Sequence, residues 1–209
     1  MSLSWSLRSF VMDIRHLDRR AQAFAAEIIA QVRPERLSVP TPCPDWTLYG
    51  LLRHIVSQNE GFAAAARGEE THLSQWRNGR IDGDPRGAYE RSAALVDEAF
   101  GAEGVLEAKF SLPEVRDGGR FPAAVAIGFH LVDTVVHAWD VAASIGAAWR
   151  PDEELVAASL AIALKVPDTP ADRGPGLAFE PAIDASSETP DRDRLLALLG
   201  RSPDWRPPA

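Results

Sequence analysis

The sequence of 209 residues predicts an all-α fold, and two observations carry this prediction. Apolar residues recur every three or four positions over several long stretches, which is the period of an amphipathic helix. Prolines and glycines separate these stretches at the places where helices would end. With 45% hydrophobic and 25% charged residues the chain can bury a full core, and we expect a single domain over residues 1–209.

The first predicted helix covers residues 11–33, where apolar side chains from Val11 to Val32 repeat with the helical period. The segment 38–45 (SVPTPCPD) follows with three prolines. Proline lacks an amide donor and disfavours helix in the residue before it, so an extended connection is expected there. The second helix should begin near Asp45, which is suited to be its N-cap.

The second predicted helix stops at Gly68, because glycine is favoured just after the end of a helix. Residues 68–84 combine glycines with mixed charges and are expected to form a loop. Three apolar residues should pin this loop to the protein: Leu73, Trp76 and Ile81. A third helix is predicted from Pro85, a residue favoured in a first helical turn, to Phe100.

After the third helix the sequence pattern predicts no clear secondary structure until the most apolar stretch of the chain begins. A short alternating piece at 105–112 fits either a strand or extended chain. The stretch 121–146 (FPAAVAIGFHLVDTVVHAWDVAASIG) predicts a long helix with most of its surface buried. Short helices are expected at 152–167 and 191–200, joined by an irregular segment rich in proline and glycine that should lie over the other helices.

The fourth predicted helix carries four ionisable residues in its apolar middle: His130, Asp133, His137 and Asp140. A helical residue turns by about 100°, so Asp133 and His137 stack one turn apart and the other two lie near the same line. Unpaired charge is costly there, and a divalent metal would compensate it. Carboxylate and imidazole are standard ligands, and His54 on the apolar side of the second helix is the candidate third ligand. Three protein ligands leave one coordination position open.

Other interpretations of these residues stay open. The histidines and aspartates could satisfy each other by hydrogen bonds without any metal. We expect His130 and Asp140 to be hydrogen-bonding partners around the site rather than ligands. Cys43 precedes the second helix, whose dipole could lower the pKa of a thiol, but a lone cysteine is more often a small buried apolar residue. His16 and His72 are expected to be exposed or in loops, without an assigned role.

The net charge and the number of cysteines exclude some classes of function. The formal net charge of −8 and the pI near 5.1 argue against a surface for nucleic acid or anionic membrane. A single cysteine allows no internal disulfide, which fits a reducing compartment. No signal peptide is recognised, and no stretch is expected to span a membrane. We therefore expect a cytoplasmic protein with neither nucleic-acid nor membrane partners.

Three segments carry a resemblance to a known family: 41–56 (TPCPDWTLYGLLRHIV), 130–146 (HLVDTVVHAWDVAASIG) and 191–205 (DRDRLLALLGRSPDW). In them the chain resembles the mycothiol-dependent maleylpyruvate isomerase family, within the wider DinB/YfiT-like superfamily, and more narrowly an uncharacterised metal-binding branch found in actinobacteria. The resemblance implies a DinB-like four-helix bundle with additional short C-terminal helices and an irregular C-terminal segment. It also implies a zinc or nickel ion bound by His54, Asp133 and His137.

The chain departs from the isomerase that it resembles in two respects. That enzyme is expected to have a glutamate where this chain has Asp133, and a separate C-terminal domain where only about sixty residues follow the fourth helix here. Isomerase activity itself is therefore not carried over, whereas the general chemistry of the superfamily is. In that chemistry a metal lowers the pKa of a low-molecular-weight thiol, and the thiolate attacks an electrophile.

Two functions follow from the resemblance. The first is a mycothiol-dependent S-transferase or isomerase, monomeric or homodimeric, in which a small-molecule thiol and an electrophile are the partners and Asp140 or His130 assists proton transfer. The second is a non-catalytic module, either stabilised by its metal or regulating contacts with another protein. A deep, open pocket at the metal would count against the second.

Overall fold

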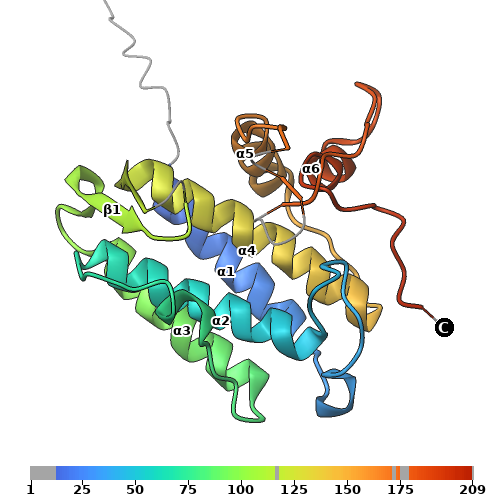
Figure 1. Ribbon diagram of the computed structural model, residues 1–209, viewed down its shortest axis with the longest axis horizontal. Helices are drawn as coiled ribbons and strands as arrows, with labels where there is room; N and C mark the ends of the chain where they lie inside the picture. Colours follow the sequence, from blue (N-terminus) through green and yellow to red (C-terminus); the bar gives the residue numbers. More distant parts are fainter. Residues whose placement is uncertain (1–12, 116–117, 171–172, 175–178, 209) are drawn as a thin grey trace, which may run out of the picture.

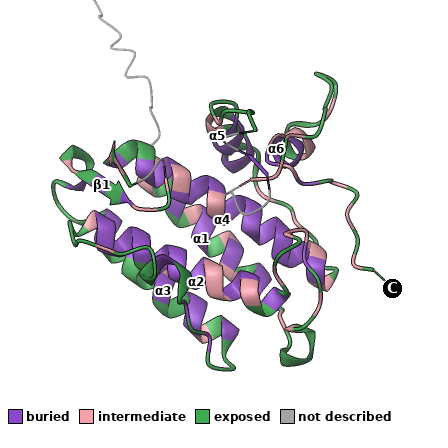
Figure 2. Cartoon of the chain, in the orientation of Figure 1, coloured by how far each residue is buried: buried purple, intermediate pink, exposed green. Residues whose placement is uncertain are grey.

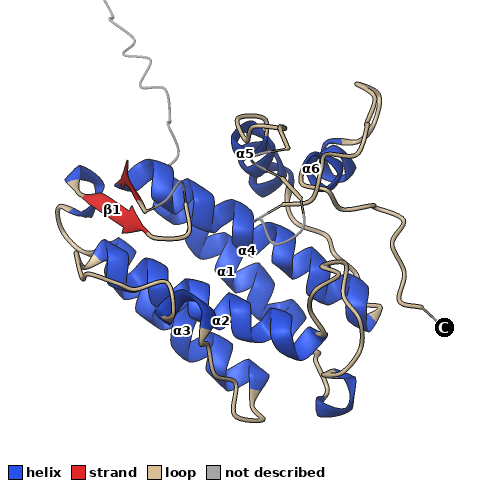
Figure 3. Ribbon diagram, in the orientation of Figure 1, coloured by secondary structure: helices blue, strands red, loops and turns tan. Residues whose placement is uncertain are grey.

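The computed structural model describes residues 13–115, 118–170, 173–174 and 179–208 of the chain. The described residues form six α-helices and one small antiparallel sheet, which confirms the all-α prediction (Figure 3). The α-helices and strands are α1 (Ile14–Ile29), α2 (Leu48–Ala66), α3 (Pro85–Gly101), β1 (Lys109–Leu112), β2 (Gly119–Pro122), α4 (Ala123–Ile145), α5 (Glu153–Ala163) and α6 (Asp191–Leu198). Three short 3-10 helices lie in the connections, at Pro34–Arg36, Gln75–Arg77 and Val105–Glu107.

Helices α1 to α4 form the predicted four-helix bundle (Figure 1). Helix α1 packs against α4 and α3, and α2 packs against the same two helices, so the four helices close into a ring. Helix α4 contributes to three clusters of buried apolar side chains in the described part of the chain. The inner faces of the helices are accordingly buried and the outer faces exposed (Figure 2). Helix α4 is thus the central element of the fold.

The length and composition of α4 would allow it to cross a membrane, contrary to the expectation that no stretch reaches that length. The position of α4 inside the protein gives another reason for its apolar composition. In the most apolar window of the helix, 78% of the residues are buried inside the protein. A helix that is apolar on nearly every side is expected where it is surrounded by other helices. We therefore interpret α4 as a core helix.

Helix α1 is shorter than the predicted helix at 11–33. Asp13 is its N-cap, and the side chain of Asp13 accepts a hydrogen bond from the backbone amide of Arg15 at 3.0 Å. At the other end the helix stops at Ile29, and the chain turns into the 3-10 helix Pro34–Arg36. The predicted start at Val11 lies outside the described residues.

Helix α2 begins later than predicted, and Asp45 is not its N-cap. The chain first makes a turn in which the amide of Trp46 donates to the carbonyl of Cys43 at 3.0 Å. Thr47 is then the cap, and its hydroxyl accepts from the amide of Gly50 at 3.4 Å. The turn uses the residues that the prediction had assigned to the first helical turn, so Asp45 lies before the helix.

The loop between α2 and α3 is pinned by two of the three residues predicted for that role. Trp76 and Ile81 are almost completely buried, whereas Leu73 is 39% exposed. The 3-10 turn at Gln75–Arg77 directs the Trp76 indole inward, and Leu73 lies ahead of this turn, facing solvent. Helix α3 starts at Pro85 as predicted, with Asp84 as its cap.

The ambiguous piece at 105–112 ends in a strand. Strand β1 pairs with β2 in antiparallel register, with Phe110 opposite Phe121. Phe110 and Leu112 are completely buried, in the cluster that includes the first turns of α4. The hairpin therefore closes one end of the bundle, and its turn projects Glu114 beside α2.

Helices α5 and α6 confirm the predicted short C-terminal helices, and α5 ends at Ala163, before Pro167. The two helices pack on each other, and α5 packs on α4 (Figure 1). The described residues of the irregular segment between them contact α6, and Phe179 in this segment also packs against the apolar cluster to which α1 and α4 contribute. The Ile183 amide donates to the carbonyl of Ala197 at 2.9 Å, and the Arg173 side chain donates to the carbonyl of Leu198 at 2.6 Å.

Gly61 on α2 makes room for the Trp76 indole, and its replacement tests this packing. A Cβ at position 61 would lie 2.5 to 2.7 Å from ring carbons of Trp76, well inside the contact distance of non-bonded carbons. We expect Gly61→Ala to lower the free energy of unfolding by about 1–3 kcal/mol despite the better helix propensity of alanine. Urea unfolding followed by circular dichroism measures this difference.

Gly101→Ala is the matched control. Gly101 is the last residue of α3, and a Cβ there meets no atom within 4 Å. We expect its stability to stay within about 1 kcal/mol of the unchanged protein or to rise slightly. A Gly61→Ala protein as stable as the Gly101→Ala protein would contradict the packing described for Trp76.

Candidate metal centre

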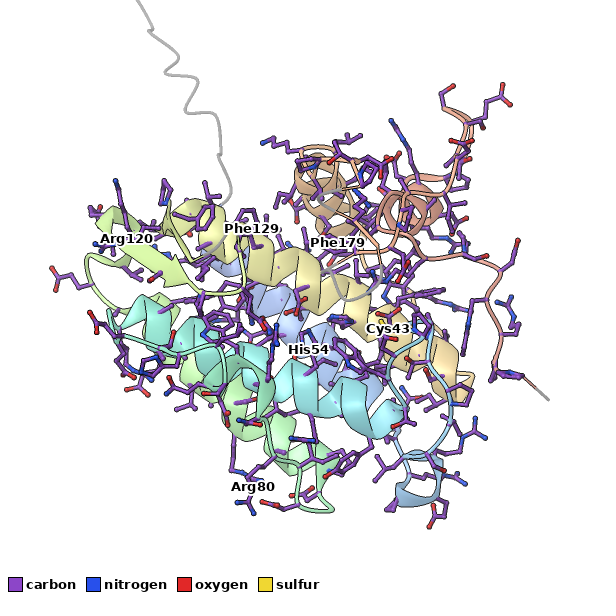
Figure 4. All side chains as sticks on the ribbon, in the orientation of Figure 1. Cys43, His54, Arg80, Arg120, Phe129 and Phe179 are labelled. Atoms are coloured by element: carbon purple, nitrogen blue, oxygen red, sulfur yellow. The ribbon has the colours of Figure 1, made fainter. Side chains whose placement is uncertain are left out.

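The three predicted ligands lie together between α2 and α4. His137 Nε2 is 3.3 Å from Asp133 Oδ1, and His54 Nε2 is 4.0 Å from the same oxygen. The donor atoms of these three residues all lie within 4.8 Å of one another. Figure 4 shows His54 on α2 at the side that faces α4. The helical spacing of Asp133 and His137 and the packing of α2 on α4 together produce this arrangement.

The donor set suits a divalent metal by both chemistry and distance. Bonds of about 2.0–2.2 Å in a tetrahedral site place ligand atoms about 3.4 Å apart, close to the distances of 3.3 and 4.0 Å between these atoms. Two imidazoles with one carboxylate are a common ligand set. Asp133, although one methylene shorter than a glutamate, reaches the position between both histidines.

Neighbouring rings orient the two histidines, and one side of the group is open. The Trp46 indole lies against the His54 ring with centroids 4.4 Å apart, and the two histidine rings meet edge to face at 5.0 Å. The side chains of His54 and Asp133 are 19% and 27% exposed, whereas that of His137 is 7% exposed. A small molecule could therefore approach from the side of His54 and Asp133.

The charge states of His54 and Asp133 suit metal binding. Burial, with a smaller contribution from the nearby His137, lowers the pKa of His54 to about 4, so this imidazole is neutral near pH 7. Burial would raise the pKa of Asp133, but His137 outweighs it and holds that pKa well below its ordinary value. Burial opposes a charge on His137, yet Asp133 and Asp140 raise its pKa well above the usual range, so a metal that bound to this ring would displace a proton from it.

Asp140 lies behind His137 and is completely buried. Its Oδ2 is 2.8 Å from His137 Nδ1 and 3.2 Å from both Cys43 Sγ and a terminal nitrogen of Arg201. Asp140 is therefore a hydrogen-bonding partner of a candidate ligand, the arrangement that its spacing in the sequence suggested. Arg201 had no predicted role, although it belongs to the segment 191–205 that carries the resemblance.

Cys43 lies in the connection that precedes α2, half-buried against the same network. Burial raises the pKa of its thiol, and the charge of Asp140 adds to this effect, which favours a protonated thiol over a nucleophile. Cys43, His137 and Asp140 also form a group with metal-ligand spacing. The Arg201 guanidinium, 3.3 Å from the sulfur, opposes a second cation there.

His130 points to a different part of the core. Its Nδ1 is 2.7 Å from Asp18 Oδ1 on α1, and its Nε2 is 3.0 Å from Asn59 Oδ1 on α2. It is thus a buried hydrogen-bonding residue of the bundle. Asp18 was not identified from the sequence. Its position was the available signal, because Asp18 lies between Leu17 and Ala21 on the apolar side of the first helix. His16 and His72 are exposed, as predicted.

Glu114 and Gln58 add polar groups near the open side. Gln58 lies one turn after His54, and its amide donates to Glu114 Oε2 at 2.6 Å. Burial raises the pKa of Glu114, whereas its hydrogen bonds with Gln58 and Arg77 oppose this shift. Glu114 was not singled out from the sequence, because the hairpin that carries it was not predicted.

Comparison with known sequences gives matches of two kinds. Residues 19–142 match the family model described as the mycothiol maleylpyruvate isomerase N-terminal domain. Two uncharacterized proteins of Mycobacterium tuberculosis, MT0763 and Rv0738, are each 35% identical to the chain over 196 residues, which cover 91% of this chain and 99% of each relative.

Solved structures show the same fold at lower identity. The crystal structure of the mycothiol-dependent maleylpyruvate isomerase matches with a TM-score of 0.56 and 19% identity over 71% of this chain. A histidine-to-alanine mutant of that isomerase matches with a TM-score of 0.60 and 18% identity, and the match covers 78% of this chain and 72% of the mutant. The chain spans 66% of the length of the first structure, so the likeness concerns the fold.

The contacts of His130 predict its contribution to stability. In His130→Leu the buried Asp18 carboxylate and the Asn59 amide oxygen lose their hydrogen bonds to His130, and the imidazole no longer pairs the buried Asp18 charge, so we expect a loss of about 3–5 kcal/mol in the free energy of unfolding. His72→Leu, at an exposed position, should change it by less than about 0.5 kcal/mol. Urea unfolding measures both. Equal stabilities of the two variants would show that the His130 contacts are not formed.

Proposed function

Because the chain belongs to the mycothiol maleylpyruvate isomerase N-terminal domain family, we propose that it is a metal-dependent thiol S-transferase or isomerase. His54, Asp133 and His137 would bind zinc or nickel, and mycothiol would be the thiol. The observation that carries the proposal is the convergence of these three donors beside an open face. We further propose that residues 1–209 act as one unit in the cytoplasm, where low-molecular-weight thiols are kept reduced.

The residues divide the work of such a site among them. A bound divalent ion would lower the pKa of a thiol that occupies its open coordination position, so that the thiolate is available near neutral pH. Asp133 offers a carboxylate and His54 a neutral ring nitrogen. His137 directs Nδ1 to Asp140, which leaves Nε2 on the side of the other two donors.

The exposure of the ligands favours this function over a purely structural metal site. Structural zinc sites are usually closed by four protein ligands, whereas sites that act on a substrate keep one position open. Here three donors converge, and two of their side chains are partly exposed. Gln58 and Glu114 beside the opening would hydrogen-bond to polar groups of the thiol or electrophile.

Metal content tests the ligand assignment. We expect purified protein to contain about one divalent ion per chain, and His54→Ala and His137→Ala to lose it after dialysis, because two donors hold such an ion weakly. Plasma mass spectrometry measures the metal. The controls His16→Ala and His72→Ala remove exposed histidines and should keep the ion. Equal metal content in all these proteins would overturn the assignment.

Thiol conjugation tests the activity. With mycothiol and monochlorobimane as substrates, we expect chelation to reduce the rate to the uncatalysed background and added zinc or nickel to restore it. The fluorescence of the bimane adduct follows the reaction, and circular dichroism checks that the chelated protein stays folded. Full activity of the folded, metal-free protein would refute the proposal. Metal binding without any conjugation would favour a non-catalytic module.

A further inference from the structure

The C-terminal segment reaches the candidate metal centre through one side chain. Arg201 follows α6, outside the residues 19–142 that match the family, and its side chain is 7% exposed. One terminal nitrogen of its guanidinium lies 3.2 Å from Asp140 Oδ2, and the other donates to the carbonyl of Leu199 at 2.8 Å. A buried cation from the C-terminal segment thus contacts Asp140, and Asp140 in turn contacts the candidate ligand His137.

Asp140 depends on this cation. The carboxylate is completely buried, and removing an ion of this kind from water costs several kcal/mol unless it is paired. Among the described residues, Arg201 is the arginine or lysine that forms an ion pair with it. The Cys43 thiol and the His137 ring supply the remaining hydrogen bonds to Oδ2. Without Arg201, the carboxylate would be buried without a permanent positive charge beside it.

The state of Asp140 determines how His137 is presented. Nδ1 of His137 lies 2.8 Å from the Asp140 carboxylate, and Nε2 is therefore the ring nitrogen that faces Asp133 and His54. This contact also fixes the rotation of the ring. Partners of this kind commonly orient metal-binding histidines, and their loss weakens metal affinity about 10–100-fold.

The packing of the C-terminal segment fixes Arg201 in turn. Its backbone amide donates to the carbonyl of Leu196 at 2.9 Å, and its guanidinium lies 5.9 Å from the centre of the Phe179 ring. Leu195, Leu196 and Leu199 are buried in the apolar cluster that includes Trp139 of α4. The position of Arg201 therefore follows from the docking of α6 and its flanking residues onto the bundle.

We propose that Arg201 is a positioning residue of the metal centre, which holds Asp140 against His137 and so fixes the imidazole nitrogen offered to the metal. This inference rests on the proposed function, because it assumes that His54, Asp133 and His137 bind the ion. It extends that function by giving the C-terminal segment a role in metal affinity.

Arg173 provides a matched control within the same segment. It is also buried, and its guanidinium lies 5.8 Å from the centre of the same Phe179 ring. It donates to backbone carbonyls, including those of Pro167 and Leu198, and its ion pair is with Asp168 at 3.0 Å and not with Asp140. Arg173→Gln therefore disturbs the anchoring of the segment without removing the partner of Asp140.

The experiment measures zinc affinity by competition with a chromophoric chelator, and follows the visible spectrum of bound cobalt. We expect Arg201→Gln to weaken zinc binding about 10–100-fold and to change the cobalt spectrum. Arg201→Lys, which keeps the charge, should recover most of the affinity. Arg173→Gln should bind within about threefold of the unchanged protein. Equal affinities of Arg201→Gln and Arg173→Gln would overturn the inference.

Asp140→Asn gives a second test that does not depend on the C-terminal segment. The amide is the same size as the carboxylate but can donate to Nδ1, which favours the hydrogen on Nε2. We expect the same loss of zinc affinity, with circular dichroism showing a folded protein, and unchanged affinity would count against the inference. If the unchanged protein binds neither zinc nor cobalt, the proposed function itself fails. Binding that is insensitive to Arg201 and Asp140 refutes the positioning role alone.

Discussion

Buried charge on α4 has to be compensated, and the rest of the structure is arranged around this requirement. Helix α4 is the central helix of the bundle, yet it carries two histidines and two aspartates within its apolar surface. Each of them is paired with a different part of the chain: His130 with α1 and α2, Asp133 with α2, His137 with its own helix, and Asp140 with the C-terminal segment. The polar pairs thus connect α4 to the elements that surround it, in addition to the apolar contacts.

The helices were predictable because their signal is local. A period of three or four apolar residues needs no knowledge of the partner surface, and the positions of α3 and α4 agree with it closely. The predictions are wrong where a contact between residues that are distant in the sequence determines the local structure. Thr47 replaces Asp45 as the cap because a turn precedes α2, and Leu73 is exposed because Trp76 fills the space beside Gly61. Neither contact can be inferred from the spacing of residues.

The candidate site shows the same limit at longer range. Asp133 and His137 share a helix, so their spacing alone brings them together, and the resemblance to a known family supported His54 as their partner. Arg201 is 61 residues from Asp140 in the sequence, in a segment whose composition suggested only a short helix. The contact depends on how α6 docks, which no periodicity describes. Residues that act through another residue are therefore the hardest part of a site to predict from the sequence.

The division of the site between bundle and C-terminal segment has a consequence for how such proteins diverge. The three candidate ligands all come from α2 and α4, so the bundle alone supplies the ligands of the proposed site. The partner of Asp140 comes from outside the bundle, where short helices and irregular chain tolerate change more easily than the core does. Changes in this segment could adjust the presentation of His137 without altering a ligand. Metal affinity and ligand identity can then change separately within one fold.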